Sequence, residues 1–173
     1  TIFKEDHEIL VNQFLTTPIR NTYNDKNGFS HGSHVAGIIS GSRSNDESYG
    51  IAFKSKFIAY GNLGLGVSDA EFDKMLDFDV KIINNSHTAY HKRFAEYAKK
   101  GILVIYASSN AARLKPTLAA LHGTGSDDNL GSWLTVGNVD SSYIQRDNSG
   151  KLTVAGRAVG GNTGNLCFEA TLY

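Results

Sequence analysis

The sequence Phe29-Ser-His-Gly-Ser-His-Val-Ala-Gly-Ile-Ile-Ser-Gly41 contains two histidines three residues apart, ahead of small and β-branched residues. A helix that begins near His31 places His31 and His34 on one face, because residues three apart are neighbours on a helix surface. Ala36 and Gly37 allow that helix to pack closely, and we expect its packing side to include His34. The apolar residues expected to bury it are Val35, Ile38 and Ile39. His31 then lies at the positive end of the helix dipole, which favours the neutral imidazole that a base requires.

The composition places the chain among ordinary globular domains. Its 173 residues are one domain's worth of chain, and Lys+Arg and Asp+Glu are equal at 17 each. This balance gives no electrostatic reason to expect nucleic acid or an anionic membrane as a partner. Cys167 is the only cysteine, so no disulfide forms within the chain. No apolar run reaches the length of a transmembrane segment, so we expect none in this stretch.

Strands and helices alternate between residues 55 and 139. The expected strands are residues 55–60, 81–84, 102–107 and 133–139, and the expected helices are a segment that begins at the capping box Ser68-Asp-Ala-Glu71 and residues 91–100. The strand at 102–107 is continuous and β-branched, which is typical of a parallel strand covered on both faces. The alternation predicts an α/β fold with a mainly parallel sheet.

The histidine stretch resembles the His-Gly-Thr-His-x-Ala-Gly motif of the subtilisin-like serine proteases (peptidase S8, the subtilases), with Ser33 in place of the usual threonine. The first histidine of that motif is the family's catalytic base, so the resemblance points to His31. It also implies the family's three-layer α/β fold, in which helices flank a mainly parallel central sheet. A further stretch, Leu134-Thr-Val-Gly-Asn-Val-Asp-Ser-Ser142, is similar to the family's Ala-Val-Gly-Ala-Val-Asp-Ser-Ser and supports the same order of elements.

The end of the strand at 102–107 carries the second candidate residue. The family ends this strand with Ala-Gly-Asn, whose asparagine amide donates to the oxyanion of the tetrahedral intermediate. Here the sequence is Ala107-Ser-Ser-Asn110, so the resemblance assigns that donor to Asn110, with Ser109 replacing the glycine and lining the same pocket. A short neutral side chain with two amide hydrogens suits this task.

A third similarity concerns substrate binding. Ile82-Ile-Asn-Asn-Ser-His87 resembles the family strand Ile-Asn-Met-Ser-Leu-Gly, whose end pairs with the substrate backbone. The resemblance makes Ser86, His87 and Thr88 the expected substrate-binding residues. Since His87 and Thr88 replace Leu-Gly, the substrate preference of the family does not carry over.

The other two members of a Ser-His-Asp triad have no match. The family's aspartate follows an apolar strand, and neither Asp6 nor Asp25 does; Gly123-Thr-Gly-Ser126 lies too early to be the serine motif. Asn165-Leu-Cys-Phe-Glu-Ala170 resembles the segment before that motif in the autotransporter subgroup. We therefore expect residues 1–173 to be an internal fragment of a catalytic domain, without the segments that carry the aspartate and the serine.

The resemblance implies a serine endopeptidase that acts on protein or peptide substrates, without nucleic acid, and that is secreted or displayed at the cell surface. Its chemistry requires no cofactor. Family members often bind structural calcium, although no acidic cluster in this sequence marks a metal site. The fragment alone is expected to be inactive, because a base without a nucleophile forms no acyl-enzyme. It is also expected to be poorly stable, because loss of the terminal segments would leave apolar faces uncovered.

Three alternatives remain open. Gly28-Phe-Ser-His-Gly32 fits the Gly-x-Ser-x-Gly elbow of α/β-hydrolases, with Ser30 as nucleophile, but no apolar strand precedes it. The pairs His31/His34 and His87/His91 have spacings that suit a metal, although no His-Glu-x-x-His motif is present. The third alternative, from a different functional class, is a non-catalytic subtilisin-like domain that binds peptides.

Overall fold

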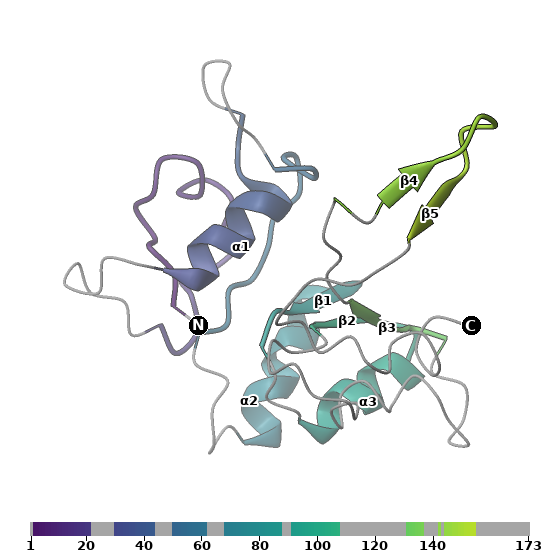
Figure 1. The fold of residues 1–173 in the computed structure, drawn as a ribbon. Helices are drawn as coiled ribbons and strands as arrows, with labels where there is room; N and C mark the ends of the chain where they lie inside the picture. The colour runs from purple at the N-terminus through teal and green to yellow at the C-terminus, as the bar shows by residue number, and fades with distance from the viewer. Residues whose placement is uncertain are drawn as a thin grey trace. The chain divides into compact units, whose positions relative to one another are not determined.

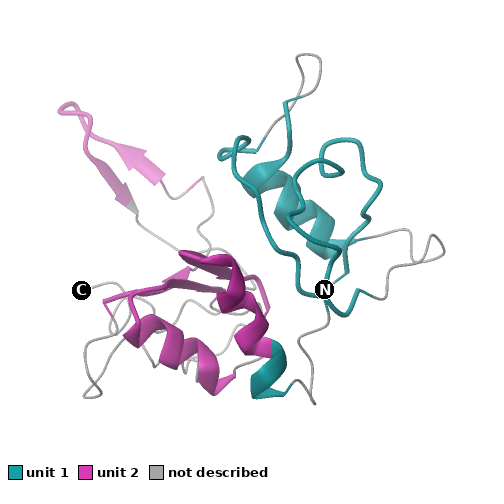
Figure 2. Cartoon of the chain, turned by 180° about the vertical axis from the view of Figure 1, so that it is seen from behind, with its two compact units in different colours: residues 1–71 teal, residues 72–173 magenta. Residues whose placement is uncertain are grey.

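A computed structural model of the chain describes residues 2–21, 30–43, 50–61, 68–87, 91–107, 131–136, 142 and 144–154 (Figure 1). In chain order, the elements are α1 (His31–Ser40), α2 (Asp69–Asp73), the 3₁₀ helix η2 (Lys74–Phe78), β1 (Ile82–Asn85), α3 (Lys92–Lys99), β2 (Leu103–Ala107), β3 (Trp133–Val136), β4 (Ile144–Arg146) and β5 (Leu152–Val154). The chain divides into two compact units, residues 1–71 and 72–173 (Figure 2).

The first unit is built around α1, which begins at His31 as the sequence predicts. Ser30 is its N-cap: the residue is extended, and its side chain accepts a hydrogen bond from the Ser33 N–H. Ala36 is buried in a small core with Phe3, Leu10 and Ala59. A Cβ atom at Gly37 would lie 3.3 Å from Ile9 Cδ1, so the small residues do allow close packing.

The prediction of which side of α1 packs was wrong. His34 is exposed, Ile38 and Ile39 are 54% and 39% exposed, and Val35 is only partly buried. The buried residues of the helix are instead the small ones, Gly32, Ser33, Ala36 and Ser40. These small residues recur at helical spacing and form one narrow buried face of the helix. The bulkier Ile38 and Ile39 lie outside that face.

The strand expected at residues 55–60 is reduced to isolated parallel bridges. Phe57 pairs with Phe14, and Tyr60 pairs with Ile19. Backbone hydrogen bonds follow the same register, from the Phe57 N–H to the Gln13 carbonyl at 3.0 Å and from the Ile19 N–H to the Ala59 carbonyl at 2.9 Å. The segment is therefore extended and paired without being a regular strand.

The second unit contains the predicted parallel sheet, in the order β1-β2-β3. Val104 pairs with Ile83 on one side and Trp133 on the other, while Tyr106 pairs with Asn85 and Thr135. All six of these residues are buried, so two aligned rows of side chains form one face of the sheet. On the opposite face, the β2 residues Leu103, Ile105 and Ala107 are only partly buried, so burial is less complete than the apolar run suggests.

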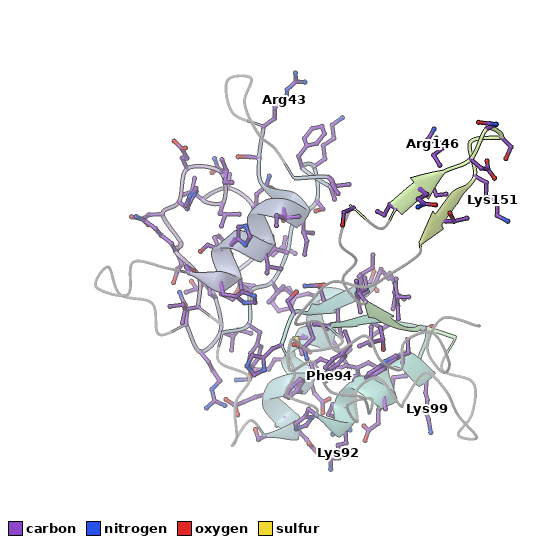
Figure 3. The ribbon with its side chains drawn as sticks, viewed as in Figure 1. Arg43, Lys92, Phe94, Lys99, Arg146 and Lys151 are labelled. Atoms are coloured by element: carbon purple, nitrogen blue, oxygen red, sulfur yellow. The ribbon has the colours of Figure 1, made fainter. Side chains whose placement is uncertain are left out.

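Helices cover the buried face of this sheet. The Phe94 ring of α3 packs edge-on against Tyr106 of β2 and against Phe72 of α2, with ring centroids 5.5 Å and 5.1 Å apart. Figure 3 shows Phe94 on the inner side of α3 and Lys92 and Lys99 directed away from it, as the amphipathic pattern predicts. The capping box is also confirmed, since Ser68 and Glu71 exchange side-chain-to-backbone hydrogen bonds of 3.0 and 3.3 Å.

A hairpin that the sequence analysis did not predict follows the sheet. β4 and β5 pair antiparallel, and the Asp147 carboxylate organises the turn between them. It accepts hydrogen bonds from the Ser149 hydroxyl at 2.6 Å and from the backbone N–H groups of Ser149 and Lys151 at 2.9 and 3.0 Å. These donors, the Ser149 hydroxyl first among them, lower the pKa of Asp147 and keep the carboxylate ionised.

Candidate active site

His31 is the first residue of α1 and is partly buried. The N-cap fixes the backbone immediately before it, because Ser30 is extended (φ −123°, ψ 94°) while the His34 N–H already donates to the Ser30 carbonyl over 3.0 Å. The imidazole is thus carried by the residue that directly follows the N-cap. The sequence correctly predicted this position.

Two hydroxyl groups join the first turn of α1 to the segment 2–4. The Ser30 hydroxyl donates to the Ile2 carbonyl over 2.6 Å, and the Lys4 N–H donates to the Ser33 hydroxyl, also over 2.6 Å. The two hydroxyl oxygens lie 2.8 Å apart. Sequence reasoning identified neither contact; the only signal was a serine on each side of His31.

The end of β1 presents the other described candidates. Ser86 is partly buried, and its hydroxyl oxygen lies 3.0 Å from Asn84 Nδ2, which donates to it. His87 is exposed, and its backbone N–H donates to Asn85 Oδ1 over 3.1 Å. The buried Asn85 therefore shapes the turn that carries Ser86 and His87. The sequence analysis assigned Asn85 no role, although an asparagine that ends a strand is a typical Asx-turn residue.

Asn110, Ser109 and Thr88 lie outside the described residues, so their predicted roles stay predictions. The structure brings Ser86 and His87 together at the end of β1, in residues 72–173, while His31 belongs to residues 1–71. Ser30, the alternative nucleophile, uses its hydroxyl hydrogen in the bond to the Ile2 carbonyl.

Metal binding finds no support among the described residues. In that part of the chain, no group of three histidine, cysteine, aspartate or glutamate side chains lies close enough to hold a metal ion. His91, one of the alternative ligands, caps α3 by accepting the Arg93 N–H at Nδ1, and its ring stacks on Phe72 with centroids 4.1 Å apart. The described helices also include none with the length and apolar character needed to cross a membrane.

The chain is similar to known proteins in both sequence and fold. The structure resembles the crystal structure of Apa1, a psychrophilic subtilisin-like protease from the Antarctic psychrotroph Pseudoalteromonas sp. AS-11, with a TM-score of 0.60 and 20% sequence identity. The likeness covers 82% of this chain and 35% of that protein, so the chain spans about a third of its length. This likeness confirms the predicted subtilisin-like α/β fold. No curated protein sequence matches the chain.

The sequence model of the subtilase family, Peptidase S8, matches residues 3–168. The match includes the histidine stretch at α1, the strands of the parallel sheet and the segment 108–110 that follows β2. These are the segments on which the sequence resemblance was based. The chain therefore belongs to the subtilase family.

Proposed function

We propose that this chain is part of a serine endopeptidase in which His31 is the general base. The observation that supports this most directly is the position of His31 as the first residue of a capped helix, within the region that matches the subtilase family. A base must be held within hydrogen-bonding reach of its nucleophile, and a fixed helix end provides that rigidity.

In the proposed reaction, His31 takes the proton from the serine hydroxyl as its oxygen attacks the peptide carbonyl carbon. The imidazolium then returns this proton to the leaving amine nitrogen as the carbon–nitrogen bond breaks, which leaves an acyl-enzyme. His31 next takes a proton from water, whose oxygen attacks the ester, and returns it to the serine as the acid product leaves. No metal or organic cofactor is required at any step.

Asn110 is the proposed oxyanion donor, and it follows β2 by three residues. A side-chain amide aimed at the developing negative charge stabilises the tetrahedral intermediate more than the ground state. Ser86, His87 and Thr88 are proposed to pair with or flank the substrate chain at the end of β1, and Ser109 to line the same pocket. The substrate is a protein or peptide.

The aspartate and the serine are proposed to lie in segments of a full-length protein beyond these residues. The chain spans about a third of the protease it resembles, and no stretch of it fits either motif. We accordingly propose that residues 1–173 form part of one catalytic domain and that they do not hydrolyse peptides by themselves. Secretion or surface display of the full-length protein is proposed from family membership.

A second candidate function is peptide binding without catalysis, and it is favoured by the absence of both motifs from the sequence. One experiment separates the two. The full-length protein is incubated with a serine-directed fluorophosphonate, and the labelled peptide is mapped by mass spectrometry. A peptidase becomes labelled on one serine, and its activity falls in proportion to the labelling. A peptide-binding domain stays unlabelled but still retains peptides on a column.

A further inference from the structure

We propose that Ser33 is a positioning residue for His31, acting with Ser30 to tie the first turn of α1 to the segment 2–4. We call Ser30 and Ser33 the serine pair. The inference rests on the proposed peptidase function, because it concerns the placement of the proposed base. It assigns a role to two hydroxyl groups that the catalytic mechanism itself does not use.

The hydrogen bonds of the serine pair have a single consistent direction. The hydroxyl of Ser30 has one hydrogen, and the Ile2 carbonyl takes it because a carbonyl can only accept. The hydrogen between the two hydroxyl oxygens, 2.8 Å apart, must then come from Ser33. Ser33 in turn accepts from the Lys4 N–H. The result is a directed chain of bonds from Lys4 through Ser33 and Ser30 to Ile2.

The segment 2–4 is held on its opposite side as well. The Phe3 N–H donates to Asn21 Oδ1 over 2.9 Å, and Asn21 Nδ2 donates back to the Phe3 carbonyl over 2.7 Å. Phe3 thus bonds to Asn21 while its two neighbours, Ile2 and Lys4, bond to the serine pair, so hydrogen bonds hold the segment from both directions.

Two attachment points restrain a helix end more than one. A single N-cap satisfies an N–H group and opposes fraying, but it bonds the helix end only to itself. The serine pair also attaches this turn to Ile2 and Lys4, and His31 lies between the two serines in sequence. Ser33 is buried, so water does not compete for its bonds. Its removal would leave the base free to shift.

The test uses the full-length protein and three variants: Ser33→Ala, Ser33→Thr, and the matched control Ser40→Ala. Ser40 is a buried serine in the same helix, but its hydroxyl bonds to the Ala36 carbonyl, away from His31. Competent sites are counted by fluorophosphonate titration, so that kcat refers to folded enzyme. We expect Ser33→Ala to lower kcat by roughly 10–100-fold with KM unchanged, since small misplacements of a base are costly. Ser33→Thr should restore kcat to within about threefold, and Ser40→Ala should leave it unchanged.

The inference is overturned if Ser33→Ala keeps the wild-type kcat per titrated site, even when its melting temperature falls, because the role of Ser33 is then structural only. If Ser33→Ala does not fold, the Ser30→Gly variant is measured instead. Glycine is tolerated as an N-cap, but this substitution removes the hydroxyl that bonds to Ile2. A wild-type kcat for that variant also overturns the inference. A wild-type enzyme that is not labelled at all contradicts the proposed function itself, a result distinct from these two.

Discussion

The phenol hydroxyl of Tyr97 donates a hydrogen bond to Asp73 Oδ1 over 3.0 Å, joining α3 to the end of α2. Tyr97 is fully buried, and the second oxygen of Asp73 accepts from Arg93 Nη2, also at 3.0 Å. Arg93 forms a further ion pair with Glu96. This polar group fixes the two helices relative to each other, and Phe94 of α3 packs on Tyr106 of the sheet.

Replacing Tyr97 with phenylalanine should lower the free energy of unfolding by about 1–2 kcal/mol. The ring and its packing remain, but a hydrogen bond to a charged acceptor is lost. Chemical denaturation of the full-length protein, with wild type and variant compared at pH 7, measures the difference. Equal stability would mean that the bond contributes nothing.

The burial of Tyr97 and its bond to Asp73 also make the free energy of unfolding depend on pH in the alkaline range. Burial, and then the hydrogen bond to Asp73, raise the pKa of Tyr97 above its ordinary value, and burial also raises the pKa of Tyr60. The unfolded chain loses these protons above a pH of about 10, and the folded chain holds them to a higher pH, so the free energy of unfolding falls as pH rises past 10. Denaturation at pH 8 and pH 11 should show a smaller loss for Tyr97→Phe than for wild type. An equal loss in the two proteins would contradict this assignment.

His91 has a double role at the start of α3, as N-cap and as a ring stacked on Phe72. His91→Ala should cost about 1–2 kcal/mol, roughly 1 kcal/mol of it from the cap. His91→Asn retains a side-chain oxygen that can cap the helix, so it should recover the capping contribution but not the stacking contribution. In thermal melts, the melting temperature should be highest for wild type, lower for His91→Asn and lowest for His91→Ala. If His91 only stacked on Phe72, the two variants would melt at the same temperature.

Phe94 connects the helix layer to the sheet through its contacts with Phe72 and Tyr106. Since its side chain is buried, Phe94→Ala should cost about 3–5 kcal/mol through lost transfer energy and the cavity left behind. Ile51→Ala is the matched control, because Ile51 is 92% exposed and should change stability by less than about 0.5 kcal/mol. Similar effects of the two substitutions would contradict the described core.

Asn110→Ala should lower kcat by roughly 10²–10³-fold with little change in KM, if Asn110 is the oxyanion donor. That magnitude is the one observed when such a donor is removed from a subtilisin, a member of the same family. Steady-state kinetics on the full-length enzyme, with circular dichroism to verify folding, provide the measurement. A variant with wild-type kcat would remove Asn110 from the site.

The sequence predicted the elements whose signals are local. The capping box at Ser68, the start of α1 at His31 and the strands of the parallel sheet all lie where pattern and propensity indicated. Gly101 also ends α3 as expected, with φ +87°, a conformation that glycine adopts without strain. These features need only neighbouring residues to be recognised.

Several of the features that failed or were missed depend on distant partners. The packing side of α1 could not be judged from its isoleucines, because the buried residues of the helix are small ones and Ile9 packs against Gly37. The serine pair bonds to residues 28 and 29 positions away along the chain. Such contacts are set by tertiary packing, which no local period encodes.

The proposal that His31 is the base of a serine peptidase is best tested by the rate of peptide hydrolysis by the full-length His31→Ala protein. We expect kcat to fall by at least about 10³-fold relative to wild type, and by more than in Asn110→Ala, because proton transfer fails in both acylation and deacylation. Wild-type kcat in a folded His31→Ala protein would show that His31 is not the base.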